Sequence, residues 1–137
     1  MIDSIASLRG LYGPVRERSQ KKQLSHLDAH CLRFIGLSPF VVLASGSAEG
    51  QYDASPRGGD PGFVKAPDAQ TLLIPDASGN NRLDTLQNIV ATGRVGLLFL
   101  IPGVDETLRV NGRARLDTGA GLLAHFAAER RPPKLVI

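Results

Sequence analysis

Residues 95–116 read VGLLFLIPGVDETLRVNGRARL, and this stretch decides the fold. Its first seven residues form a continuous apolar run, which predicts a buried central strand. Pro102 and Gly103 predict a turn directly after it. From residue 108 to residue 116 polar and apolar side chains alternate, which predicts a second strand. Two strands joined by so short a turn run antiparallel.

Outside this stretch the sequence predicts more short strands and few helices. Strands are expected at residues 40–44, 51–55, 71–74 and 134–137. Apolar side chains at helical spacing predict helices over residues 20–36 and 82–92 and a short one around residue 123. This order predicts a mostly β fold with short α-helices, built on a small antiparallel barrel with helices at its ends.

A chain of 137 residues has room for one domain, residues 1–137, around a single hydrophobic core. The sequence ends within the strand expected at residues 134–137, which would leave an unpaired strand edge. We therefore expect either that the natural chain continues or that a partner chain covers this edge.

Composition argues against several classes of function. No apolar run reaches the ~20 residues of a membrane span, and the N-terminus lacks a signal-peptide pattern, so we expect no membrane partner. The single cysteine, Cys31, cannot form an internal disulfide and fits the cytoplasm. A net charge of +3 with dispersed basic residues, five Phe, two Tyr and no Trp argues against a nucleic-acid partner.

Two polar, glycine-rich stretches follow predicted strands, at residues 55–62 and 75–82. Their glycines would let backbone N–H groups approach a ligand, and each stretch adds an arginine, Arg57 or Arg82. Asn80, Asn81 and Arg82 precede a predicted helix, whose free N–H groups favour an anion such as a phosphate. The alternative is that both stretches are turns, with Asn80 or Asn81 as the N-cap of the helix.

Other reactive side chains do not form a recognisable site. His26 and His30 have the spacing of a zinc-binding helix, but no third ligand stands near them in the sequence, so we expect no metal. Cys31 lies on the apolar stripe of the predicted helix and should behave as a small hydrophobic residue. The Gly-x-Ser-x-Gly motif of a hydrolase is absent from the sequence, and no catalytic residue is assigned.

Several segments together resemble the pyridoxamine-5′-phosphate-oxidase-like FMN-binding proteins, and a bacterial subgroup of undefined substrate in particular. The segments carrying the resemblance are SPF at 38–40, DASPRGG at 53–59, LIPD at 73–76, GNNRLD at 79–84, GLLFLIPG at 96–103 and ETLRVNG at 106–112. They occur in the family's order over about residues 20–137.

The resemblance implies a six-stranded antiparallel split β-barrel that dimerises and holds two FMN molecules between its subunits. It also implies which residues bind the cofactor. These are Ser55 and Arg57 on one strand, Ile74 and Pro75 at the end of the next, Asn80, Asn81 and Arg82 before the helix, Thr107 near the flavin ring, and, more weakly, Lys65.

The family's oxidases also contact substrate and flavin through C-terminal Arg, His and Trp residues, and this sequence has no Trp and ends before that portion. The expected function is therefore an FMN-dependent oxidoreductase acting on a small molecule other than pyridoxamine phosphate. The alternatives are a non-catalytic flavin- or haem-related binding module and a deazaflavin-dependent reductase.

Overall fold

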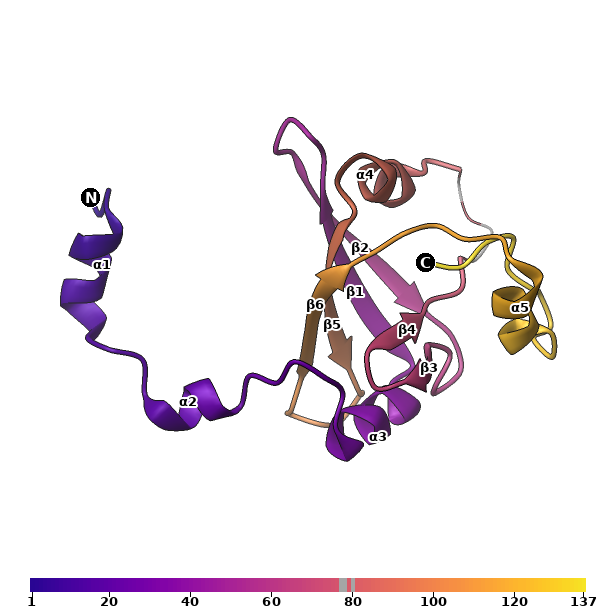
Figure 1. Cartoon of the computed structure of the whole chain (residues 1–137), viewed down its shortest axis with the longest axis horizontal. Helices are drawn as coiled ribbons and strands as arrows, with labels where there is room; N and C mark the ends of the chain where they lie inside the picture. The colour runs from indigo at the N-terminus through magenta and orange to yellow at the C-terminus, as the bar shows by residue number, and fades with distance from the viewer. Residues whose placement is uncertain (77–78, 80) are drawn as a thin grey trace.

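A computed structural model of the chain describes residues 1–76, 79 and 81–137. Within these residues the regular structure is mostly antiparallel β with short helices (Figure 1). The strands are β1 (Phe40–Gly46), β2 (Tyr52–Gly58), β3 (Lys65–Asp68), β4 (Thr71–Leu73), β5 (Arg94–Leu100) and β6 (Leu108–Arg113). The α-helices are α1 (Ile5–Tyr12), α2 (Glu17–Lys21), α3 (Ala29–Leu37), α4 (Asp84–Thr92) and α5 (Ala120–Leu123), which runs into the 3-10 turn η1 (Ala124–Phe126).

The larger sheet has four strands in the order β2-β1-β5-β6, and β3 and β4 form a second sheet. The hairpin predicted from residues 95–116 is present as β5 and β6, with Leu97 opposite Val110. Side chains alternate across this sheet because successive residues of a strand point to opposite faces. Val41, Leu43 and Phe99 therefore point inward and are fully buried.

Helices α3 and α4 cover the inner face of this sheet. Phe34 and Ile35 of α3 and Leu86 and Ile89 of α4 join the same core as the inward side chains of β1 and β5. Figure 1 shows β3, β4 and α5 on this side of the sheet as well. The other face, which we call the outer face, carries no helix in the described part of the chain.

The prediction of a single helix over residues 20–36 is wrong. The structure has α2 and α3 with a break between them, and α3 begins only after Asp28. The Asp28 backbone is extended, and its carboxylate accepts a 2.8 Å hydrogen bond from the Cys31 N–H, as an N-cap does. This bond holds the pKa of Asp28 below its usual value. Leu27, expected on the helix stripe, donates its N–H to Ala69 O beside β3.

Other strand boundaries also differ from the prediction. Strand β2 continues through Pro56 to Gly58; it is an edge strand, where the missing N–H of proline is tolerated. Strand β6 ends at Arg113 instead of residue 116, and β3 was not predicted.

The C-terminal residues have strand partners on both sides, so the unpaired edge expected there is not found. Val136 exchanges backbone hydrogen bonds of 2.9 Å with Asp117, and Ile137 exchanges bonds of 2.9 Å with Ile74. The last residues thereby connect the segment that follows β6 with the segment that follows β4. Among the described residues, no helix has the length and apolar character that a membrane crossing requires.

Candidate functional site

A cavity of about 1250 Å³ opens beside β2, large enough for a cofactor-sized ligand. Its walls come from β2 and the loop after it, described residues between β4 and α4, helix α4 itself, and C-terminal residues within 129–135. Described residues of both glycine-rich stretches that the sequence indicated, residues 55–62 and 75–82, therefore face the same space.

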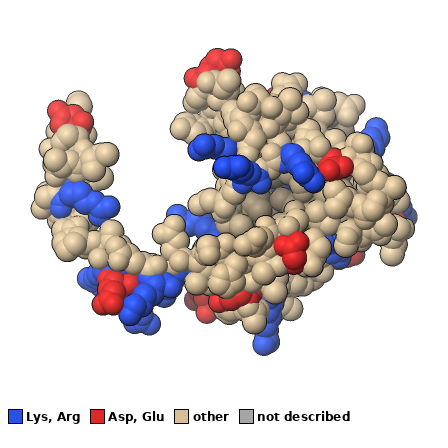
Figure 2. All heavy atoms as spheres, in the orientation of Figure 1, with Lys and Arg blue, Asp and Glu red and all other residues tan. Residues whose placement is uncertain are grey.

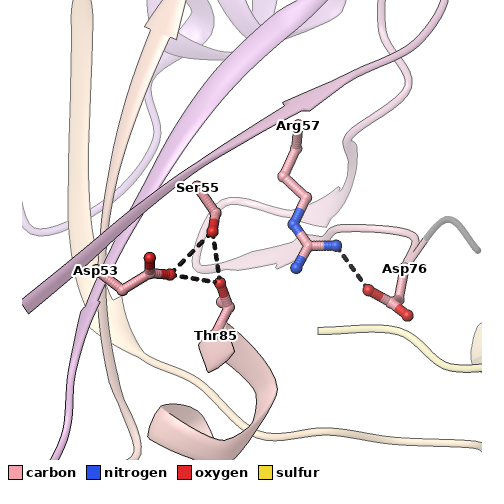
Figure 3. A network of polar contacts seen from close by, with 5 residues as sticks. All are labelled: Asp53, Ser55, Arg57, Asp76 and Thr85. Atoms are coloured by element: carbon pink, nitrogen blue, oxygen red, sulfur yellow. Dashed lines mark hydrogen bonds and ion pairs between the residues drawn. The ribbon is translucent and has the colours of Figure 1, made fainter. Parts of the chain in front are cut away.

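Strand periodicity brings three polar side chains of β2 to this cavity. Asp53, Ser55 and Arg57 alternate with exposed residues and are each half-buried. Arg57 Nη1 donates a 2.6 Å hydrogen bond to Asp76 Oδ1, and the two side chains are 16% and 18% exposed (Figure 3). Arg57 Nε is buried and has no hydrogen-bond partner among the described residues. A buried guanidinium N–H without an acceptor is costly, so this atom marks a place where a ligand oxygen would fit.

A second polar cluster lies further along β2. Ser55 Oγ donates to Asp53 Oδ2 at 2.9 Å, and Thr85 Oγ1, from the first turn of α4, lies 3.0 Å from both oxygens (Figure 3). Thr85 is only 3% exposed. These bonds fix the start of α4 against β2 and so fix one wall of the cavity.

The turn before α4 has an unusual backbone. Asn81 and Leu83 both have φ of 59°, in the left-handed region, which asparagine tolerates but leucine rarely adopts. Leu83 is the N-cap of α4 and makes no side-chain cap hydrogen bond. Asn81 is thus not the N-cap, as one interpretation of the sequence had it. Arg82 Nε donates to Asp84 Oδ2 at 3.0 Å, with both side chains largely exposed.

The structure brings some of the expected cofactor-binding residues together and leaves others apart. Those that line the cavity are Ser55, Arg57, Pro75, Asn81 and Arg82. Asn80 lies outside the described residues.

The other three expected residues lie away from this cavity. Ile74 is buried in the core, and its backbone pairs with Ile137. Lys65 Nζ donates to Gly62 O at 2.9 Å, which ties it to the loop after β2. Thr107 is exposed and directly precedes β6.

Sequence reasoning missed the acidic and C-terminal parts of the wall. The described lining holds four basic side chains, Arg57, Arg82, Arg131 and Lys134, and five carboxylates, Asp53, Asp60, Asp76, Asp84 and Glu129. Two of the basic residues are paired with two of these carboxylates. Asp53 could have been found from the strand period alone, because residues 53, 55 and 57 share one face once β2 is extended to Arg57.

Other reactive groups lie apart from this cavity. In the described chain no group of three His, Cys, Asp or Glu side chains is arranged to hold a metal ion. Cys31 is half-buried; burial, followed by the hydrogen bond to Asp28, raises the pKa of its thiol, so the thiolate is disfavoured.

Comparisons with known proteins agree with this architecture. The family model described as pyridoxamine 5′-phosphate oxidase matches residues 27–137. The structure of a histidine-to-alanine variant of HupZ from Group A Streptococcus is similar, with a TM-score of 0.65, 18% identity, and coverage of 80% of this chain and 90% of HupZ. A candidate pyridoxamine 5′-phosphate oxidase from Lactobacillus delbrueckii has a TM-score of 0.64 at 16% identity, covering 84% of this chain and 88% of its own. No curated protein sequence matches significantly.

Proposed function

Because this chain belongs to the pyridoxamine 5′-phosphate oxidase family, we propose that it binds FMN in the cavity beside β2 and uses it to oxidise or reduce a small molecule. The observation that carries the proposal is that described residues of both glycine-rich stretches line one cavity. At its wall lies the buried Nε of Arg57, which has no hydrogen-bond partner among the described residues.

The residues present fit this cofactor. Arg57 and Arg82 line the cavity and would bind the phosphate, since guanidinium groups donate paired hydrogen bonds to phosphate oxygens. Pro75 and Asn81 line the same wall at the end of β4 and before α4, where the family resemblance expects flavin contacts. FMN would supply the redox reactivity, and the protein would supply binding, orientation and polarity.

The polar residues of β2 and α4 would hold this site in shape. Thr85 Oγ1 contacts both Asp53 Oδ2 and Ser55 Oγ, so the first turn of α4 cannot move away from β2 without breaking these bonds. A fixed cavity wall lowers the entropic cost of binding a large ligand.

We further propose that the fold closes as a six-stranded split barrel and that two subunits share the FMN sites. The bridges from Val136 to Pro75 and to Asp117 support closure, because they link the segments after β4 and after β6. The resemblance implies that Thr107 contacts the flavin. Thr107 does not line the cavity of its own chain, so in this proposal the contact comes from a partner subunit.

Pyridoxamine phosphate is not the proposed substrate. The oxidases that the sequence resembles contact substrate and flavin through Arg, His and Trp residues, and the given sequence contains no Trp. Interactions with the non-reacting parts of a substrate contribute to turnover as well as to affinity, so losing them should lower the rate.

The binding proposal is tested with two ligands and two variants. FMN and riboflavin differ in the phosphate, so Arg82→Ala should weaken FMN by about 1.5–3 kcal/mol, the typical value of a hydrogen bond to a charged group, and leave riboflavin unchanged. Arg33→Ala is the matched control, because Arg33 is exposed on α3 and does not line the cavity. Equal FMN affinity in wild type and Arg82→Ala, measured by fluorescence titration, would place the phosphate elsewhere.

Turnover is tested separately by anaerobic stopped-flow mixing. The FMN-loaded protein should be bleached by a nicotinamide donor and reoxidised by air, but not bleached rapidly by pyridoxamine phosphate. FMN that binds but is reduced by no donor would favour a non-catalytic binding module. A deazaflavin bound in preference to FMN would favour the deazaflavin-dependent reductase.

A further inference from the structure

The first 26 residues form an arm that stands away from the rest of the chain (Figure 1). Every residue of this arm except Gly13 is exposed, and neither α1 nor α2 contains a buried residue. The family match begins at residue 27, so the arm lies outside the matched segment. The role of the arm must therefore be inferred from its own residues.

Helix α1 has the features of a packed helix although nothing in the described part of its own chain covers it. Ser4 caps its N-terminus, and Gly13, with φ of 67°, ends it. Its apolar side chains, Ile5, Leu8, Leu11 and Tyr12, fall on one side at helical spacing, and three of them are 68–80% exposed. An isolated helix of eight residues is unstable in water, so α1 needs a surface that covers this side.

The outer face of the four-stranded sheet is a second uncovered surface, apolar over β1, β2 and the middle of β5 and polar along β6 and at the start of β5, with Arg94, Arg109, Asn111 and Arg113. Along one row across the sheet, Pro56, Val42 and Leu98 lie side by side, with Arg109 at the edge. Ala44 beside them is exposed, and Tyr52 is 93% exposed. Figure 1 shows the arm beyond β6, across a gap from the sheet and on the side away from α5.

The total exposed surface is larger than that of a compact monomer of the same mass. A compact monomer of 14.6 kDa exposes about 6,900 Å². This chain exposes 10070 Å², about 3,200 Å² more. A stable protein–protein interface buries roughly 1,200–2,000 Å² in total, so the excess is large enough for an extensive contact between two copies.

We propose that the arm is an exchanged element: α1 of each chain packs its apolar side on a second copy, within the same interface that covers the outer face of the sheet. A second copy accounts for both uncovered surfaces at once, since a two-fold pair brings the same patches of both chains together. This inference rests on the dimer proposed above and adds the arm to it.

The charge of the arm suggests an alternative partner for it, an anionic surface. The arm holds five basic and two acidic residues, a net charge of +3, which equals the net charge of the whole chain, so residues 27–137 are neutral overall. Figure 2 shows Lys and Arg side chains gathered over α2. An anionic lipid surface would suit such an arm, but it would leave the outer face of the sheet uncovered.

Two adjacent substitutions in the full chain separate these possibilities. Ile5→Glu places a carboxylate on the apolar side of α1, and Ala6→Glu places the same charge one residue further, on the other side. Both positions are exposed in the first turn, where an acidic residue does not disturb the helix. We expect Ile5→Glu to raise the dimer dissociation constant at least tenfold and Ala6→Glu to change it less than threefold, by analytical ultracentrifugation.

Photo-crosslinking gives an independent measurement. With p-benzoylphenylalanine in place of Tyr12, which is 79% exposed, irradiation should give a covalent dimer on a denaturing gel. Three results would overturn the arm exchange while leaving the dimer intact: an unchanged dissociation constant for Ile5→Glu, crosslinks confined to one chain, or crosslinks only to added phosphatidylserine vesicles. A wild-type protein that is monomeric with FMN bound would overturn the dimer as well.

Discussion

At the scale of single residues, the Arg57–Asp76 pair decides how strongly the cavity attracts an anion. Nη1 of Arg57 already donates a hydrogen bond to Asp76 Oδ1, so a phosphate bound here would share the guanidinium group with this carboxylate. Nε remains without a partner in the described chain. Asp76 should therefore stabilise the ligand-free protein and weaken phosphate binding. A substitution of Asp76 can separate these two effects.

Asp76→Asn should move stability and affinity in opposite directions. Without ligand, Arg57 loses its charged partner in a largely buried position, and the free energy of unfolding should fall by about 1–3 kcal/mol. FMN affinity should rise about three- to tenfold, because the competing carboxylate is gone, whereas riboflavin affinity should not rise. Thermal unfolding with and without each flavin measures both effects. Weaker FMN binding in this variant would mean that Asp76 helps to hold the cofactor.

At the scale of elements, local sequence patterns predicted the central hairpin, β1 and most of α4 because each has a clear period or apolar run. The same patterns failed where a side chain acts on the backbone. Asp28 ends the helical stripe by capping α3, and Leu27 pairs with Ala69, which is distant in sequence. The pairing of Val136 with Asp117 and Pro75 likewise depends on tertiary contacts.

The sequence predicted those parts of the candidate site that depend on neighbouring residues, and missed those that depend on contacts between distant segments. The glycine-rich stretches and their arginines are visible in the sequence, and the structure brings Arg57 and Arg82 to one cavity. Asp76 and Thr85 were missed because their roles depend on which strand faces which helix. Leu83 was missed for another reason, since nothing in its residue type indicates a left-handed N-cap.

The loop between β2 and β3 forms part of the cavity wall, and Gly62 sets its shape. Gly62 has φ of 77°, donates its N–H to Ser38 O, and would place a Cβ 2.9 Å from Gly36 O at the end of α3. Gly62→Ala should lower the free energy of unfolding by more than the ~1–2 kcal/mol cost of a left-handed alanine. Gly50→Ala is the control, with φ of 84° but open space around it. Equal losses in the two variants, measured by urea denaturation, would show that the loop accommodates the added Cβ without an extra loss of stability from the contact with Gly36 O.

At the scale of the whole molecule, the FMN proposal and the dimer proposal are linked through Thr107. The cavity opens on the inner side of β2, while the uncovered apolar face and the arm lie on the other side of the sheet. Thr107 lies outside the cavity of its own chain. If a partner supplies Thr107 to the flavin, dimerisation and cofactor binding must stabilise each other, because each favours the same assembled state.

Leu98→Lys should therefore weaken the dimer and FMN binding together. Leu98 is half-buried in the middle of the outer face, opposite Val42 and Arg109, so a lysine there would place an unpaired charge in an apolar interface. Such a charge costs several kcal/mol, which corresponds to an increase of at least ~100-fold in the dimer dissociation constant. Leu37→Lys is the matched control, because Leu37 is 51% exposed at the end of α3, where a lysine is favourable. Light scattering at micromolar concentration and FMN titration of the same samples measure both quantities. A monomeric Leu98→Lys variant that binds FMN as tightly as wild type would show that each chain holds its flavin alone.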